Sequence, residues 1–149
     1  MKNSKKIIIV SGYFNPLHKG HIEYFELSKS NGDLLLVIIN NDYQRKLKGS
    51  KFFMDEIERE LIVSKLKVVD FTLLSIDKGR SVVETLKLIN TKYAKNYDLV
   101  FANGGDQTIQ TSPEKEICDL LGIGFIDGMG DKIQSSSWLL TDYNDQNRK

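Results

Sequence analysis

The feature that most constrains this sequence is a series of short, almost wholly apolar segments separated by stretches with helical spacing. Uninterrupted apolar runs of four to six residues are typical of strands covered on both faces, as in a parallel sheet. Strand–helix alternation repeated along one chain favours a doubly wound α/β domain. We therefore predict a single Rossmann-like α/β domain with a five-stranded, mostly parallel sheet, in which the strands are Ile7–Val10, Leu34–Ile39, Phe71–Leu74, Leu99–Ala102 and Ile123–Ile126.

Three of the intervening stretches carry clear helix signals. Ser81 followed by Glu84 is a capping-box pattern at the start of one helix. Ser112 as N-cap and Pro113 at the first helical position predict the start of another, and Gly122 predicts its end. The apolar positions that predict the three helices are Val82, Leu86, Ile89 and Tyr93; Met54, Ile57, Leu61, Ile62 and Leu66; and Ile117, Leu120 and Leu121.

Length, charge and cysteine content narrow the class of protein. A chain of 149 residues fits one domain, which we place at residues 1–140, followed by a polar tail at 141–149. With 21 basic and 20 acidic side chains, there is no strong positive field to hold nucleic acid. No apolar run approaches the roughly 20 residues of a membrane helix, and the single cysteine, Cys118, excludes an internal disulfide. We expect a cytoplasmic protein that binds neither nucleic acid nor membranes.

Ligands of open α/β sheets bind beyond the carboxyl ends of the strands, so the segment 11–21 after the first strand is the first place to search. Gly12 lets the chain leave the strand in a tight turn. His18 and His21, the two histidines of the chain, are three residues apart at a predicted helix start, so both imidazoles can face one side. Gly20 lies between them and would let a phosphate approach the helix N-terminus. This pattern indicates an anion site, against the alternative of two ordinary helix residues.

The run His18-Lys19-Gly20-His21 resembles the H-x-G-H signature of the nucleotidyltransferase superfamily. The wider stretch is similar to small cytidylyltransferases such as glycerol-3-phosphate cytidylyltransferase, although Tyr13 and Asn15 stand where that pattern has Thr and Asp. The Phe-Asn-Pro form of this stretch is similar to adenylyltransferases that make dinucleotide cofactors. The resemblance extends over nearly the whole chain.

The resemblance implies roles for residues at several strand ends. Some of these residues also have plain structural interpretations. Arg45, Lys46, Lys48 and Lys51 could form a solvated basic loop, and Arg59 could pair with the helix carboxylates of Asp55 and Glu56. The glycines after the fourth strand could form a plain turn, and the serines could cap a helix. An arginine that the family places before the serines is absent, and Lys132 is the candidate to replace it. The resemblance implies a catalytic role for His18, His21 and Lys48; nucleotide binding by Gly12, Tyr13, Phe14, Gly20, Gly105, Asp106, Ser135, Ser136 and Ser137; and acceptor binding by Lys46 and Arg59.

The reaction implied is attack by an acceptor phosphate on the α-phosphorus of a nucleoside triphosphate, with release of pyrophosphate. The favoured form is a cytidylyltransferase that uses CTP and a small phosphorylated alcohol, such as glycerol 3-phosphate, or a sugar phosphate. The alternatives are an adenylyltransferase that uses ATP on a sugar phosphate or mononucleotide, and a non-catalytic nucleotide-binding regulator. We expect Mg²⁺ to be held mainly by the triphosphate, without a protein metal site, and we expect a homodimer. An NAD-dependent dehydrogenase is disfavoured because no G-x-G-x-x-G follows the first strand.

Overall fold

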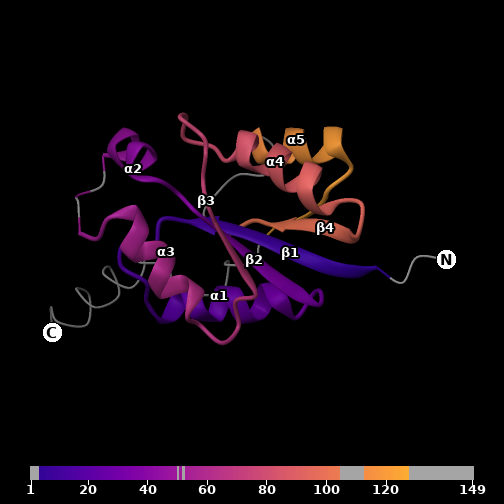
Figure 1. Ribbon diagram of the computed structural model, residues 1–149, viewed down its shortest axis with the longest axis horizontal. Coiled ribbons are helices and arrows are strands. Elements are labelled where there is room, and N and C mark those ends of the chain that lie inside the picture. The colour runs from indigo at the N-terminus through magenta and orange to yellow at the C-terminus, as the bar shows by residue number, and fades with distance from the viewer. Residues whose placement is uncertain (1–3, 50, 52, 105–112, 128–149) are drawn as a thin grey trace, which may run out of the picture.

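The computed structural model describes residues 4–49, 51, 53–104 and 113–127. Strands and helices alternate along the chain, with one place where two helices follow each other (Figure 1). Every predicted strand is present within two residues of its expected bounds. The elements are β1 (Lys5–Gly12), α1 (Lys19–Lys29), β2 (Leu34–Ile39), α2 (Asp42–Lys48), α3 (Glu56–Ser64), β3 (Phe71–Leu74), α4 (Val83–Tyr93), β4 (Tyr97–Ala102), α5 (Pro113–Leu121) and β5 (Gly124–Ile126).

The five strands form one sheet in the order β3-β2-β1-β4-β5, and each neighbouring pair is parallel. The predicted α/β class is confirmed. Gly12 at the end of β1 is level with Ile39 at the end of β2, and Ile39 is level with Leu74 at the end of β3. The connections that follow these strands therefore leave the sheet at one shared edge. The order of the strands reverses between β1 and β4, which is where ligands of such sheets bind.

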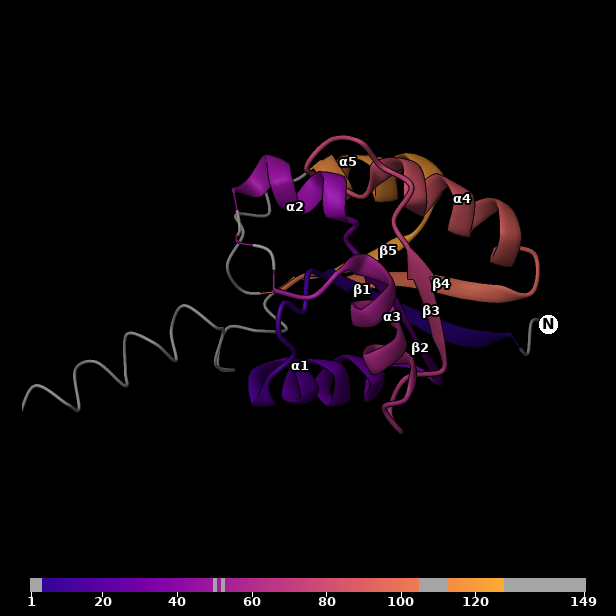
Figure 2. The same ribbon diagram turned by 60° about the vertical axis from the view of Figure 1, so that its left-hand side comes forward.

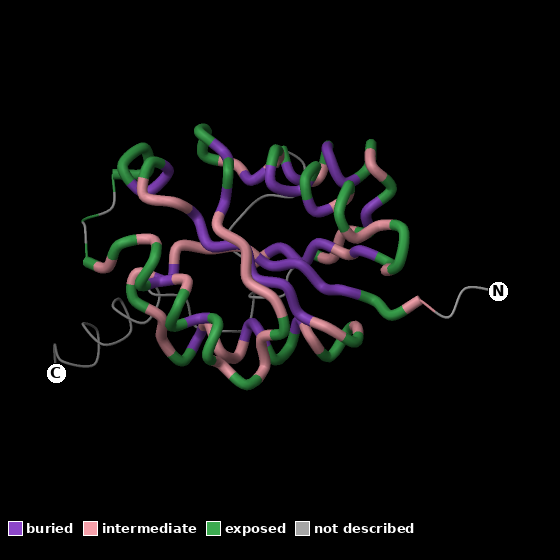
Figure 3. Tube along the Cα trace, viewed as in Figure 1, coloured by how far each residue is buried: buried purple, intermediate pink, exposed green. Residues whose placement is uncertain are grey.

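Helices cover both faces of the sheet, α1 and α3 on one side and α4 and α5 on the other (Figure 2). The first layer packs Phe25 and Val63 against alternate residues of the central strands, and the second packs Leu86 and Ile117 against the others. Successive residues of a strand face opposite sides, so both sides of β1 and β2 are buried (Figure 3). Burial on both sides is why these strands are apolar without interruption.

Two predicted helices bury different residues than expected. In α3 the buried residues are Arg59 and Val63, whereas Ile57 and Leu61 are 65% and 56% exposed. In α5, Leu120 is 79% exposed, and Cys118 is buried in its place. Among the described residues, no helix has the length and apolar character needed to cross a membrane.

The start of α4 is capped by a residue that the sequence pattern did not indicate. Val82 is the N-cap and makes no side-chain capping bond, so the predicted Ser81–Glu84 capping box is wrong. Instead the buried carboxylate of Asp77 accepts hydrogen bonds from the backbone N–H groups of Glu84 and Thr85, at 2.8 and 2.9 Å. A carboxylate from the preceding loop thus satisfies the orphan donors of the first turn.

This difference gives a stability test. Asp77→Ala leaves the N–H groups of Glu84 and the buried Thr85 without an acceptor, and we expect it to lower the free energy of unfolding by about 2 kcal/mol. Ser81→Ala is the matched control and should change that free energy by less than about 0.5 kcal/mol. Urea denaturation followed by circular dichroism measures both variants. A larger loss in Ser81→Ala than in Asp77→Ala would restore the capping box.

Candidate active site

The two histidines close the first turn of α1. His18 is the N-cap, and its Nδ1 accepts a hydrogen bond from the backbone N–H of Gly20 at 3.0 Å. The Nδ1 of His21 accepts one from the backbone N–H of His18 at 3.1 Å. The imidazoles therefore take the two roles that Ser and Glu play in a capping box. Because its amide is already bonded to His18, Gly20 serves the geometry of this turn rather than offering a free N–H to a phosphate.

The two rings lie against each other and against the core. Their centroids are 3.9 Å apart with an angle of 30° between the ring planes, a stacked arrangement. The ring of Phe14 meets His21 edge-on at a centroid distance of 5.0 Å, and Phe14 is 2% exposed. A Cβ on Gly12 would lie 2.7 Å from the Phe14 ring, so this glycine makes room for it. The buried side chain of Phe14 supports His21 and is not available to contact a nucleotide.

The environment of the pair fixes its protonation. Burial, the charge of His18 and the charge of Lys48 together lower the pKa of His21 from 6.5 to about 3. Burial also lowers the pKa of His18. A neutral imidazole carries one proton, and each Nδ1 is occupied as an acceptor, so the proton lies on Nε2 in both rings. The site therefore presents two neutral N–H donors.

Lys48 approaches the two imidazoles from α2, the helix that follows β2. Asn41 and Gln44 form a capping box that starts α2, and Gly49 ends the helix with a φ of 83°. Lys48 lies in the last turn, with its Nζ 4.6 Å from the centroid of the Tyr13 ring. Its effect on the pKa of His21 shows that its charge reaches the imidazole pair. The structure thus brings His18, His21, Lys48 and Tyr13 together, as the sequence predicts.

Lys46 and Arg59 are placed differently from the expected acceptor site. Lys46 is exposed, and two residues apart on a helix do not face each other, so Lys46 points to another side of α2 than Lys48. Arg59 is fully buried, with 0% exposure. The geometry argues against acceptor binding by Arg59, because a side chain with no exposed surface cannot reach a dissolved substrate.

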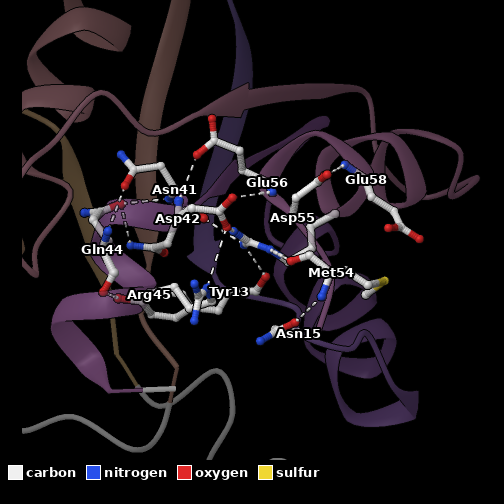
Figure 4. Close-up of polar contacts among 12 residues, drawn as sticks. Tyr13, Asn15, Asn41, Asp42, Gln44, Arg45, Met54, Asp55, Glu56 and Glu58 are labelled. Carbon is white, nitrogen blue, oxygen red and sulfur yellow. Dashed lines mark hydrogen bonds and ion pairs between the residues drawn. The ribbon is translucent and has the colours of Figure 1, made fainter. Parts of the chain in front are cut away.

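Arg59 instead ties together the segments that carry the site. Its Nη1 donates to the carbonyl of Tyr13 at 2.8 Å and to the carbonyl of Asn40 at 2.7 Å. Its Nη2 donates to Asp42 at 2.8 Å, and its Nε donates to the carbonyl of Met54 at 3.1 Å. Figure 4 shows Asp42 and Met54 in this network. The alternative that Arg59 pairs with Asp55 or Glu56 is therefore wrong, because its bonds go to Asp42 and to the carbonyls of Tyr13, Asn40 and Met54.

The other half of the sheet edge is formed by the ends of β4 and β5. Asn103 after β4 is buried, and its Nδ2 donates to Asp127 after β5 at 3.0 Å. This bond links two strand ends beside the point where strand order reverses. The predicted nucleotide residues Gly105, Asp106, Ser135, Ser136 and Ser137, together with Lys132 and the N-cap Ser112, lie outside the described residues.

Comparison with known proteins decides the family. Residues 9–129 match the family described as cytidylyltransferase-like. The chain belongs to the cytidylyltransferase-like family. It is thereby a member of the nucleotidyltransferase superfamily, as its sequence predicts. Of the five strands, β2, β3, β4 and β5 lie wholly within the matched residues, as do both histidines.

Three individual proteins are similar to this chain in sequence or structure. The chain is 33% identical over 132 residues to the bifunctional protein HldE of Geobacter metallireducens, with 83% of the chain and 25% of HldE covered. It therefore spans about a quarter of the length of the HldE relatives. It is 32% identical over 116 residues to the FAD synthase of Picrophilus torridus, with 78% and 77% covered. A lipopolysaccharide core biosynthesis protein of Thermoplasma volcanium has a similar structure, with a TM-score of 0.67, 26% identity, and 83% and 95% covered.

Two further features of this cytidylyltransferase-like site were not predicted. A solvated basic loop was one interpretation of Arg45, Lys46, Lys48 and Lys51, whereas residues 42–48 form a capped helix. The signal was present, because Asn41 followed three residues later by Gln44 is a capping pattern and Gly49 is a typical C-cap. Arg80, in the loop after β3, was also missed, since neither a motif nor a helical period marks it.

The low pKa of His21 makes stability depend on pH. The unfolded chain takes up a proton at His21 near pH 6.5, whereas the folded chain does so only near 3. The contribution of neutral His21 is therefore fully present above pH 6.5 and is lost as the pH falls towards 3. Between pH 7.5 and pH 5 this single residue should lower the free energy of unfolding by about 2 kcal/mol.

His21→Asn should reduce that pH dependence, because an amide oxygen can replace Nδ1 as acceptor without titrating in this range. His18→Asn is the control and should keep more of the dependence, since His18 is less buried. Urea denaturation at a series of pH values measures the effect. An unchanged pH dependence in His21→Asn would show that His21 is not held neutral by burial.

Proposed function

We propose that the protein transfers an adenylyl group from ATP to the phosphate of a small acceptor, with a sugar 1-phosphate as the favoured acceptor, and releases pyrophosphate. The observation that carries this proposal is the stacked pair of neutral imidazoles at the strand-end edge, both protonated on Nε2. Two fixed N–H donors suit an anion whose charge is redistributed during reaction. Family membership supports nucleotidyl transfer as the reaction class.

The choice of ATP over CTP is supported by the relatives. The chain is homologous to the C-terminal part of HldE, which serves in ADP-heptose synthesis with ATP. FAD synthase, by its name, makes a product that contains adenine. Both favour the alternative of an adenylyltransferase over the cytidylyltransferase first expected from the sequence. A sugar phosphate acceptor agrees with HldE and with the Thermoplasma volcanium protein, which by its name serves in lipopolysaccharide core biosynthesis.

In the proposed reaction an oxygen of the acceptor phosphate attacks the α-phosphorus of ATP. The new P–O bond forms as the bond between the α-phosphorus and the bridging oxygen breaks, and pyrophosphate leaves with that electron pair. No general base is required, because the acceptor phosphate is already ionised at neutral pH. The chain has to position the two substrates and stabilise charge on the oxygens around phosphorus. His18 and His21 would donate from Nε2 to an α-phosphate oxygen and to the bridging oxygen.

Lys48 supplies a full positive charge beside these neutral donors. An ammonium close to the pair offsets the negative charge that develops on the leaving pyrophosphate. Mg²⁺ would enter with the triphosphate and shield its charge. Within the described residues, no group of three or more His, Cys, Asp or Glu side chains is placed to hold a metal. That the ion has no protein ligand stays a prediction. A homodimer and a cytoplasmic location stay predictions.

Pyrophosphate release with ATP or CTP and a panel of acceptors tests the proposal. The panel consists of sugar 1-phosphates, FMN and glycerol 3-phosphate. We expect turnover with ATP to exceed turnover with CTP at least tenfold, and His18→Asn and His21→Asn each to reduce it roughly 10²- to 10³-fold. Lys19→Ala is the matched control, because Lys19 lies between the histidines in sequence with its side chain 79% exposed. It should keep turnover within about threefold of wild type.

Other outcomes of this assay contradict the proposal. Faster turnover with CTP would restore the cytidylyltransferase. Binding of ATP without pyrophosphate release on any acceptor would favour the non-catalytic regulator. Turnover within threefold of wild type in both histidine variants would remove the imidazole pair from the mechanism.

A further inference from the structure

The loop between β3 and α4, residues 75–82, lies beside α2 in both ribbon views (Figures 1 and 2). Polar side chains from the end of β2 fasten it there. The Nδ2 of Asn41 donates to the carbonyls of Ser75 and Asp77, both at 2.9 Å. Asp77 in turn holds the first turn of α4. The loop is therefore bound at its start to the edge of the sheet that carries the imidazole pair.

Gln44 of α2 fixes the tip of this loop. Its side chain is fully buried, and its Nε2 donates to the carbonyls of Gly79 and Ser81, each at 2.8 Å. Its Oε1 accepts from the Nδ2 of Asn40 at 3.2 Å and from the backbone N–H of Asn41 at 3.1 Å. A buried amide has to be hydrogen-bonded to be stable, and here both of its N–H groups hold the carbonyls on either side of Arg80.

Arg80 itself combines a fixed backbone with an exposed side chain. The hydroxyl of Tyr13 donates to the backbone carbonyl of the same Gln44 at 3.4 Å, so Arg80 and Tyr13 are anchored to one residue. Burial raises the pKa of Tyr13, and the charges of Arg80 and Arg59 act against that rise. The guanidinium of Arg80 is thus within electrostatic reach of the Tyr13 hydroxyl, while Lys48 lies over the Tyr13 ring.

We propose that Arg80 binds the phosphate group of the acceptor substrate, which deepens the proposed function and rests on it. A guanidinium matches a phosphate with two parallel N–H···O bonds, and fixing its backbone reduces the conformational freedom that binding would otherwise remove.

The position of Arg80 also suits binding of the acceptor. Arg80 follows β3, on the opposite side of β1 from β4, whereas a nucleotide is expected where strand order reverses between β1 and β4. An attacking phosphate held over β2 and β3 would approach the α-phosphorus from the side away from β4.

Arg80 takes the place of the two residues first expected to bind the acceptor. The guanidinium of Arg59 is buried and hydrogen-bonded within the protein, so it cannot bind a substrate. Lys46 is on a different side of α2 from Lys48. Arg80 is exposed and belongs to a loop that is bonded to the site at both ends. The ligand class is a phosphate monoester.

Two measurements test the assignment. In the first, inorganic phosphate is titrated into the protein and binding is followed by NMR. We expect Arg80→Gln to weaken phosphate binding about 10- to 100-fold, the loss that corresponds to one charge-assisted pair of hydrogen bonds. Lys78→Ala is the matched control, since Lys78 is an exposed cation of the same loop, and it should bind phosphate within about twofold of wild type. Equal binding by Arg80→Gln and wild type, or no binding by wild type at tens of millimolar phosphate, overturns the proposal.

In the second, KM values are measured with ATP and the acceptor from the panel that gives pyrophosphate release. We expect Arg80→Gln to raise the KM of the acceptor about 10- to 100-fold while the KM of ATP changes less than about twofold, with Arg80→Lys recovering part of the loss. A rise in the KM of ATP instead would assign Arg80 to the triphosphate. If wild type releases no pyrophosphate with any acceptor, the proposed function fails, and the phosphate titration still decides whether Arg80 is an anion site.

Discussion

The site depends on two hydrogen bonds from backbone amides to histidine rings at the start of α1. The first amides of any helix lack partners within the helix, and here the Nδ1 atoms of His18 and His21 accept two of them. The same bonds that stabilise the helix start orient both rings and place their protons on Nε2. Burial against Phe14 keeps His21 neutral. Folding and chemistry thus use the same contacts.

A second set of hydrogen bonds joins the segments at the strand ends around the two histidines. Arg59 joins the loop after β1, the end of β2 and the first residue of α2 through one buried guanidinium. Asp42 also exchanges hydrogen bonds with Glu56, because its backbone N–H donates to the Glu56 carboxylate at 2.8 Å and its own carboxylate accepts from the Glu56 N–H at 3.1 Å (Figure 4). The guanidinium of Arg59 is fully buried in its ion pair with Asp42, and removal of Asp42 would leave that charge without its carboxylate partner, which is strongly destabilising. We infer that the position of Lys48 on α2 relies on Arg59.

The sequence was sufficient to predict the sheet because each strand is covered on both faces and is therefore apolar without interruption. It predicted the imidazole pair because spacing alone puts both rings at one helix start. It could not tell which face of α3 is buried, since apolar Ile57 is exposed while charged Arg59 is not. Nor could the sequence predict the different environments of three cationic side chains. Arg59 is buried and bonded to backbone carbonyls, and Lys48 lies over the Tyr13 ring. Arg80 is exposed, and the carbonyls on either side of it are held by Gln44. Those differences arise from tertiary contacts that no local pattern records.

The protonation of the imidazole pair can be measured directly by ¹⁵N NMR of the histidine side chains in the free protein. The structure requires both rings to be neutral and protonated on Nε2 at pH 7, and His21 to remain so down to pH 5. A ring protonated on Nδ1, or a His21 that titrates near its ordinary pKa of 6.5, would contradict the claim that the site presents two neutral Nε2–H donors.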